Sequence, residues 1–413
     1  ADEAYAGMRH PAKILKQGRP AASIQIRAII EQFLRKRPEI VTMLINSIGG
    51  EKGKFDFEAP WISEVRAEVA TYLASLGGAN VMTGPAKSDT CSSPLRHGII
   101  KAWALAIGDP AALAADWLVN GAPAGIAMPI PDFGVFPNKE DNDDFTIEDL
   151  EQQEIDTGNY LSLEDYADKD KVMQKIMDPQ REWVKVFSDE GELSQYLGGE
   201  KPIFNPFGLV LKEIKDERNE TIGMKERLIL DSKITNANKA ARCRQRVVLP
   251  RVVDPVHNAM KLLRWIRRHK LIKSFVSWLI ADYEDAFWMI PLHKRERRFQ
   301  CARFGGKVMA LLRTGQGTKN AGLTWSHISA LIARLVQSLF DESEALLEVF
   351  TDDPILATAG DGPQQRLRHA IAMVAWIIVG LRLAFHKASR GQHVVWIGAA
   401  YTIADDRVTV ALN

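Results

Sequence analysis

Two apolar runs flank a pair of aspartates in ALLEVFTDDPILA, residues 345–357. Short apolar runs separated by a polar pair are typical of a β-hairpin, and this one would place Asp352 and Asp353 near the turn. Adjacent strand residues face opposite ways, so a turn is where both carboxylates could approach one ion. The alternative is an ordinary Asp-rich turn, which is the commoner meaning of an isolated Asp pair.

A third carboxylate follows a second apolar stretch. In WLIADYEDAFWMIPL, residues 278–292, Asp282 closes the apolar run 275–281. Two divalent ions roughly 3.5–4 Å apart need carboxylates from separate strands, and hard oxygen ligands suit Mg²⁺. The sequence therefore predicts a metal site formed by Asp282, Asp352 and Asp353.

A glycine-containing loop lies between these elements, in RTGQGTKNAGLTWSHISALIARL, residues 313–335. Gly315 and Gly317 allow a close backbone approach to a ligand, and the apolar positions from Leu323 onward predict a helix. Such a loop is suited to hold a template base or a nucleotide. The alternative is an ordinary loop-to-helix junction, which often shows the same pattern.

Charge is distributed unevenly along the 413 residues, although 53 Lys+Arg against 52 Asp+Glu give a net charge of only +1. Residues 140–170 hold thirteen acidic residues and one basic residue, a local charge of −12. Residues 225–313 hold twenty-one basic and seven acidic residues, a local charge of +14. We interpret the acidic stretch as a solvated linker, with the shielding of a basic groove as the alternative.

The basic block favours contact with a phosphate backbone, and a solvated surface is the alternative. Its clusters, residues 239–251, 261–273 and 294–307, are expected to flank the carboxylates.

Overall composition is ordinary for a globular protein, with 46% hydrophobic and 25% charged residues, which excludes wholesale disorder. Three distant cysteines without zinc-ligand spacing argue against a disulfide framework and a structural zinc.

Residues 1–139 are predicted to form a helical N-terminal extension, and residues 140–200 an acidic linker. Ser23 is the expected N-cap of a helix whose apolar face includes Ile26 and Ile30. The longest apolar run, residues 370–381, is shorter than the roughly 20 residues of a bilayer span. No signal pattern is visible, so the sequence leaves the location open, with an intracellular one, in the cytoplasm or nucleus, as the expectation. The missing initiator Met predicts a fragment of a longer reading frame.

In their order, these elements resemble the reverse transcriptases of retroelements, most like those of long-terminal-repeat and tyrosine-recombinase retrotransposons. Asp282 with Ala286 and Phe287 is similar to motif A, D-x-x-x-A-F, and GTKNAGLTW, residues 317–325, to motif B. FTDD, residues 350–353, resembles the Y/F-x-D-D box.

The resemblance extends on either side of these three motifs. RLILDSKITN, residues 227–236, resembles the fingers motif, and Lys387 matches the lysine of motif D. Three positions depart from the usual residues: Gly322 replaces Pro, Phe350 replaces Tyr, and Lys233 replaces Arg.

The resemblance implies an α+β fold, the right hand of a polymerase, in a domain at 201–413. Its fingers would lie at about 201–275, and its palm, an RRM-like antiparallel sheet with helices, at about 276–400. The thumb would be largely missing. Asp282, Asp352 and Asp353 would hold two Mg²⁺ ions, with Mn²⁺ as a substitute. The matched motifs imply the remaining roles. The triphosphate would meet Lys225, Arg227 and Lys233, and the nucleotide would be bordered by Gln316, Gly317 and Lys319. Phe287 would crowd a ribose 2′-hydroxyl, and Lys387 would assist proton transfer to pyrophosphate.

The implied function is RNA-directed DNA synthesis, with an RNA or DNA template, a primer and dNTP as partners, no membrane, and an oligomeric state that the sequence leaves open. Alternatives are an inactive nucleic-acid-binding remnant and an RNA-dependent RNA polymerase.

Six tryptophans are expected to be core residues rather than base-stacking platforms: Trp265, Trp278, Trp288, Trp325, Trp376 and Trp396.

Overall fold

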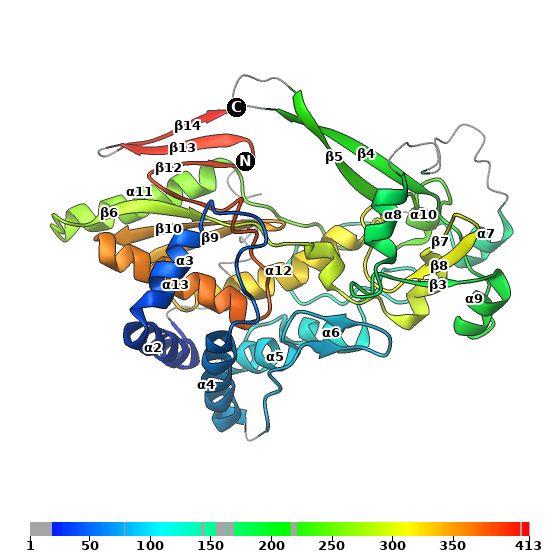
Figure 1. Ribbon diagram of the computed structural model, residues 1–413, viewed down its shortest axis with the longest axis horizontal. Coiled ribbons are helices and arrows are strands. Elements are labelled where there is room, and N and C mark those ends of the chain that lie inside the picture. Colours follow the sequence, from blue (N-terminus) through cyan, green and yellow to red (C-terminus); the bar gives the residue numbers. More distant parts are fainter. Residues whose placement is uncertain are drawn as a thin grey trace.

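The protein is described here by a computed structural model, which covers residues 19–77, 79–141, 144–153, 163, 169–215, 221–404 and 407–412. It is a mixed α/β chain with several small sheets (Figure 1), and every ladder between its described strands is antiparallel. The expected combination of helices with antiparallel sheets is confirmed. Within the described part, no helix is long and apolar enough to cross a membrane.

The central sheet contains four strands, in the order β11 (Ser389–Gly391), β6 (Phe275–Ile280), β10 (Asp353–Gly360) and β9 (Ala345–Phe350). Strand β10 lies between β9 and β6, with Ile355 opposite Ile280. Both faces of the sheet are covered, which explains why its strands are continuous apolar runs rather than strict alternations.

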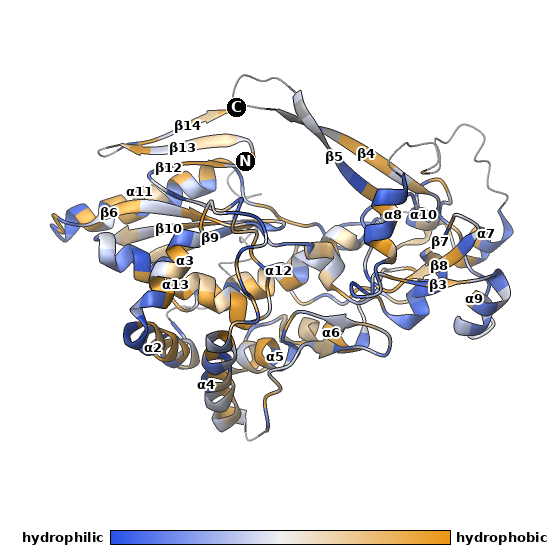
Figure 2. Ribbon diagram, viewed as in Figure 1, coloured by the Kyte–Doolittle hydropathy of each residue, from blue (hydrophilic) through white to orange (hydrophobic). Residues whose placement is uncertain are grey.

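Alternate residues of the sheet enter two different cores. Trp278 and Ile355 pack with α11 (Val253–Arg268) and with the sheet β12 (His393–Trp396), β13 (Ala399–Ala404) and β14 (Arg407–Leu412). Leu279 and Leu356 belong to the core on the opposite face, with α12 (Ala321–Gln337) and α13 (Gly362–Ile378). Figure 2 shows hydrophobic stretches along α12 and α13, both of which are buried.

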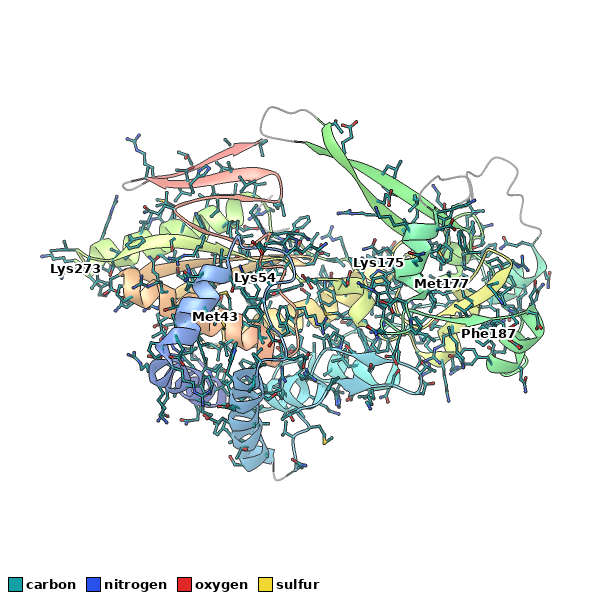
Figure 3. All side chains as sticks on the ribbon, viewed as in Figure 1. Met43, Lys54, Lys175, Met177, Phe187 and Lys273 are labelled. Atoms are coloured by element: carbon teal, nitrogen blue, oxygen red, sulfur yellow. The ribbon has the colours of Figure 1, made fainter. Side chains whose placement is uncertain are left out.

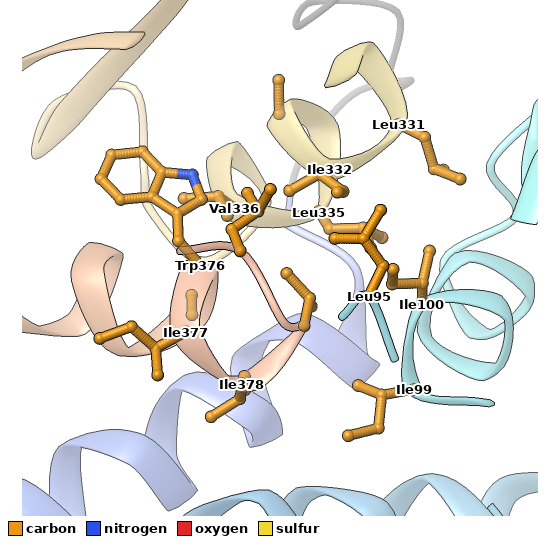
Figure 4. Close-up of a cluster of buried hydrophobic side chains, with 14 of the residues drawn as sticks. Leu95, Ile99, Ile100, Leu331, Ile332, Leu335, Val336, Trp376, Ile377 and Ile378 are labelled. Carbon is orange, nitrogen blue, oxygen red and sulfur yellow. The ribbon is translucent and has the colours of Figure 1, made fainter. Parts of the chain in front are cut away.

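The N-terminal helices share that second core with α12 and α13. They comprise α2 (Ala21–Lys36), α3 (Pro38–Ser47), α4 (Pro60–Gly77), α5 (His97–Ala106), η2 (Ala112–Asp116) and α6 (Trp117–Asn120). Figure 4 shows Leu95 and Ile100 close to Leu335, in the buried cluster that also holds Ile99 and Trp376. The division of the chain at residue 139 is therefore not a division between separate hydrophobic cores.

Ser23 is not the N-cap of the first helix. Helix α2 begins at Ala21, and Ser23 lies inside it, fully buried, 2.5 Å from the hydroxyl of Ser338. The predicted apolar face is correct, because Ile26 and Ile30 are both buried. The cap prediction was wrong because Ser23 has a tertiary partner rather than a local one.

A second lobe carries the smaller sheets (Figure 1, right). Its strands are β3 (Val184–Phe187), β8 (Lys307–Leu311) and β7 (Cys301–Phe304), together with the hairpin β4 (Phe207–Lys215) and β5 (Thr221–Leu230). Its helices are α7 (Ile147–Gln152), α8 (Lys169–Met177), α9 (Glu190–Tyr196), α10 (Ala237–Ala240) and η5 (Lys294–Phe299). Two short strands, β1 (Ala86–Lys87) and β2 (Ser92–Ser93), and the 3-10 helix η4 (Ala286–Met289) complete the described elements.

The described part of the acidic stretch packs against this lobe rather than standing free in solvent. Leu150 of α7 is buried beside Ala237 and Phe299. Glu151 accepts a hydrogen bond of 2.6 Å from Arg298, a member of the basic block. Composition alone predicted a solvated linker because a single buried leucine and an ion pair leave no compositional signal.

Candidate active site

The hairpin predicted around the aspartate pair is present. Strands β9 and β10 join through a two-residue turn, Thr351 and Asp352, because Phe350 pairs with Asp353. Thr351 has φ +59°, a left-handed conformation that β-branched residues seldom adopt. Asp352 therefore lies in the turn, and Asp353 is the first residue of β10.

Asp282 lies beside that turn. Beyond the end of β6 the backbone stays paired, because the Ala281 N–H donates to Pro354 O at 3.2 Å and the Tyr283 N–H donates to Asp352 O at 2.9 Å. Asp282 is the residue between these two hydrogen bonds. Acidic residues that are 70 positions apart in the sequence thus lie at the same end of one sheet.

The two carboxylates influence each other. Burial raises the pKa of Asp352, and the negative charge of Asp282 raises it further. Lys387 and Arg227 oppose this rise through their positive charges. Burial and a like charge both oppose the ionisation of Asp352, and a nearby cation would stabilise its ionised form. The local electrostatics therefore favour the binding of a cation beside Asp352.

Lys387 is the cation that contacts Asp282 directly. Its Nζ donates to both carboxylate oxygens of Asp282, at 2.7 and 2.8 Å. The Ala384 N–H donates to Asp282 O at 2.9 Å, and this bond holds the segment that carries Lys387 against the end of β6. The lysine side chain is 45% exposed, so the ion pair lies at the open side of the site.

The carboxylate pair suits a hard cation. Mg²⁺ commonly takes one or two protein carboxylates and completes its shell with phosphate oxygens and water. Across the described residues, no three His, Cys, Asp or Glu side chains gather into a metal-binding group. Participation of Asp353 as a third ligand therefore stays a prediction.

Strand β5 and the turn after it carry the basic residues expected at the triphosphate. Arg227 is exposed, and its charge acts on Asp352 as described above. Lys225 pairs with Lys212 through the backbone, and its side chain lies outside the described part of the chain. Lys233 is exposed in the turn after β5, where its N–H donates to the Asp231 carboxylate at 3.0 Å.

The glycine-containing loop packs against the end of β5. The Leu230 N–H donates to Gln316 O at 2.8 Å. Gly317 has φ +102°, and a Cβ there would lie 2.4 Å from Leu230 O. Gly317 thus lies close to the backbone of the protein's own strand β5, and its predicted approach to a ligand stays a prediction.

Two further residues of the predicted site contact protein groups. The Lys319 ammonium donates to Ala241 O at 2.8 Å and lies 3.6 Å from the Asp141 carboxylate. Phe287 is half-buried in η4, with its ring centroid 6.5 Å from that of Trp325. The structure therefore brings Asp282, Asp352 and Lys387 together and holds Lys319 in contacts of its own.

One basic cluster lies away from the carboxylates. Residues 261–273 form the end of α11 and the loop into β6, whereas Asp282 follows the opposite end of that strand. A six-residue strand spans roughly 20 Å, and Figure 3 shows Lys273 at an outer tip of the molecule. The expectation that every basic cluster flanks the site was wrong here, because β6 separates this cluster from Asp282.

Two of the tryptophans make hydrogen bonds that the sequence did not indicate, and one is exposed rather than buried. Trp325 and Trp396 are buried, as expected, yet their indole N–H groups hydrogen-bond to the hairpin that carries Asp352. Nothing in the residue pattern indicated these bonds, since a buried indole looks the same in sequence with or without a partner. Trp265 is 41% exposed, so the prediction that it is a core residue was wrong. It lies on the outer side of α11, with its ring tilted against that of His269 and the ring centroids 3.7 Å apart.

Comparison with solved structures finds viral reverse transcriptases. A foamy viral protease-reverse transcriptase in complex with double-stranded DNA matches 60% of this chain at 13% identity and a TM-score of 0.37. The same kind of protein in complex with an RNA/DNA hybrid matches 57% at 12% identity and a TM-score of 0.35. The chain covers 41% and 26% of those two structures.

No protein-family model matches the chain, and no curated protein matches it. TM-scores below 0.5 do not establish a shared fold, so the functional proposal depends on the geometry of the site and on the sequence motifs.

Proposed function

We propose that the chain catalyses template-directed nucleotidyl transfer, as an RNA-directed DNA polymerase built on a right-hand palm and fingers. The observation that carries the proposal is the position of Asp282 between two backbone hydrogen bonds to the hairpin of Asp352. The central sheet would be the palm, and the lobe with the β4–β5 hairpin would be the fingers. The basic residues on that lobe would contact the template-primer backbone without reading its sequence.

Each group of residues at the site would have its own role in the reaction. Asp282 and Asp352, with Asp353 nearby in sequence, would hold Mg²⁺, which when bound lowers the pKa of a primer 3′-hydroxyl and neutralises charge on the leaving pyrophosphate. Arg227, with Lys225 and Lys233, would orient the triphosphate. Phe287 would exclude a ribose 2′-hydroxyl, and Gln316 would border the sugar.

Lys387 would have two successive partners. In the protein alone its ammonium neutralises Asp282. Once a metal cation neutralises that carboxylate, the ammonium would be released and could donate a proton to the pyrophosphate oxygen. Its 45% exposure supports this role, because an exposed lysine can move without leaving a cavity.

Primer extension on an RNA template tests the proposal. We expect Mg²⁺-dependent incorporation of dNTP in preference to rNTP, and loss of incorporation in Asp352→Asn with retained template binding by fluorescence anisotropy. Glu342→Gln is the matched control, since it neutralises an exposed carboxylate whose partner is the surface residue Lys261.

One result would reject the proposed mechanism, and two others would favour a different function. Undiminished incorporation by Asp352→Asn would reject the mechanism. Preference for rNTP would favour an RNA polymerase. Template binding without incorporation in the unmodified chain would favour an inactive nucleic-acid-binding remnant.

A further inference from the structure

The carbonyl of Thr351 is held by two side chains of one helix. Trp325 Nε1 donates to Thr351 O at 2.8 Å, and Ser329 Oγ donates to the same oxygen at 2.9 Å. Both donors lie on α12, one helical turn apart, and both are buried. Two donors therefore occupy both lone pairs of a single turn carbonyl.

The next two carbonyls of the hairpin are also held, each from a different element. Asp352 O accepts the Tyr283 N–H at 2.9 Å. Asp353 O accepts Trp396 Nε1 at 3.0 Å, from the end of β12. Three consecutive carbonyls are thus fixed by α12, the segment after β6, and β12.

The backbone at this turn needs such support. A non-glycine residue in the left-handed region costs about 1–2 kcal/mol, and Thr351 has φ +59°. Without external hydrogen bonds a two-residue turn could relax to another backbone conformation, and the direction of the Asp352 side chain would change with it. The donors on α12 therefore oppose a specific distortion at the residue that precedes Asp352.

Packing alone does not explain these indole hydrogen bonds. Trp278 and Trp376 are as deeply buried as Trp325 and Trp396. Their Nε1 atoms nevertheless find no acceptor among the described residues. The two cores thus tolerate unpaired indoles elsewhere, whereas both indoles beside the Asp352 turn are paired with its backbone.

We infer that Trp325, Ser329 and Trp396 are positioning residues, which hold the Asp352 turn in the geometry that cation binding and nucleotidyl transfer require. This inference rests on the proposed function. All three side chains are buried and hydrogen-bond to the hairpin, so they would act through the backbone of residues 351–353. They would affect the chemical step and cation affinity, with little effect on the binding of nucleotide.

The test compares Trp→Phe substitutions at paired and unpaired indoles. Trp325→Phe and Trp396→Phe each remove one hydrogen bond while keeping a large aromatic ring. Trp376→Phe and Trp278→Phe remove the same atoms where no hydrogen bond is lost. We expect kcat for dNTP incorporation to fall about tenfold in the first pair, with KM for dNTP within about twofold, and no such fall in the second pair.

A second measurement works whether or not the chain extends primers. Mn²⁺ binding to the protein without nucleotide, followed by electron paramagnetic resonance, should weaken at least about threefold in Trp325→Phe and remain unchanged in Trp376→Phe. Adding Ser329→Ala to Trp325→Phe should weaken it further. Thr351→Gly in that background should restore part of the affinity, because glycine adopts positive φ without cost.

The outcomes separate the two proposals. If the unmodified chain shows no incorporation but the Mn²⁺ differences appear, the proposed function fails and the positioning role stands. If incorporation occurs but all four Trp→Phe variants behave alike, the positioning role fails and the function stands. Absence of Mn²⁺ binding in the unmodified chain would overturn the positioning role. Circular dichroism melts confirm that each variant is folded.

Discussion

The Nζ atom of Lys387 lies 2.7 and 2.8 Å from the two carboxylate oxygens of Asp282, so one ammonium group spans both oxygens. Asp282 follows strand β6 and Lys387 lies in the turn before β11, and the Ala384 N–H bond to Asp282 O joins the two segments. A metal ion that binds Asp282 would therefore either share the carboxylate with an existing cation or displace it. Competition between a resident ammonium and an incoming metal can be measured.

Lys387→Met should tighten Mn²⁺ binding while slowing catalysis. Removal of an exposed ion pair worth about 0.2–1 kcal/mol would strengthen Mn²⁺ affinity by up to about fivefold. Loss of the proton donor would lower kcat about tenfold or more. Mn²⁺ titration and primer extension measure the two effects, with Lys36→Met on the exposed end of α2 as the control. Weaker Mn²⁺ binding in Lys387→Met would contradict the competition.

Gly317→Ala and Gly322→Ala should have opposite effects on stability. A Cβ at Gly317 would meet Leu230 O at 2.4 Å, at a positive φ, whereas a Cβ at Gly322 meets nothing within 4 Å. We expect Gly317→Ala to lower the free energy of unfolding by about 2 kcal/mol or more. Gly322→Ala, inside α12, should raise it by up to about 1 kcal/mol. Urea denaturation distinguishes them, and equal stabilities would show that the loop does not pack on β5.

The local features of the site were predictable, because their determinants are close together in the sequence. The turn at Asp352 follows from two apolar runs separated by a polar pair. The pairing of β6 with β10 was not predicted, since an apolar strand does not specify its neighbour. The ion pair of Lys387 with Asp282 likewise depends on tertiary structure.

Other features had no signal in the sequence. An amphipathic helix such as α2 reveals that one face is buried, but not that the face lies against α13. The indole hydrogen bonds of Trp325 and Trp396 depend on where a backbone carbonyl of a distant hairpin lies. A buried polar group becomes interpretable only when its partner is known.

Glu344 should make stability depend on acid pH. It accepts hydrogen bonds from Arg27 at 2.8 Å and from Arg368 at 3.0 Å. Burial alone would raise its pKa, but hydrogen bonding and charge from Arg27, with the charge of Arg368, lower the pKa to about 2. Because the folded pKa lies below the usual 4.5, this stabilisation is complete above about pH 4.5 and is lost as the pH falls toward 2.

The measurement is urea denaturation of Glu344→Gln across this pH range. At pH 7 we expect a loss of about 2 kcal/mol, since hydrogen bonds to charged groups are worth about 1.5–3 kcal/mol. The difference from the unmodified chain should shrink as the pH drops from about 4.5 to 2. Glu342→Gln should change stability by less than about 1 kcal/mol at any pH. A pH-independent loss in Glu344→Gln would contradict the role of its charge.

Asp109 should be essential for joining the N-terminal helices to α12. Its carboxylate oxygens lie 2.6 and 2.8 Å from Nε and Nη2 of Arg334, and both side chains are fully inaccessible to solvent. Asp109→Asn would leave a buried guanidinium without its counter-charge, at a cost of about 3–5 kcal/mol. Arg334→Met in the same chain removes that charge, so the double variant should be more stable than Asp109→Asn alone. A double-mutant cycle by urea denaturation measures this coupling, and a loss below about 1 kcal/mol in Asp109→Asn would show that this ion pair does not hold the two regions together.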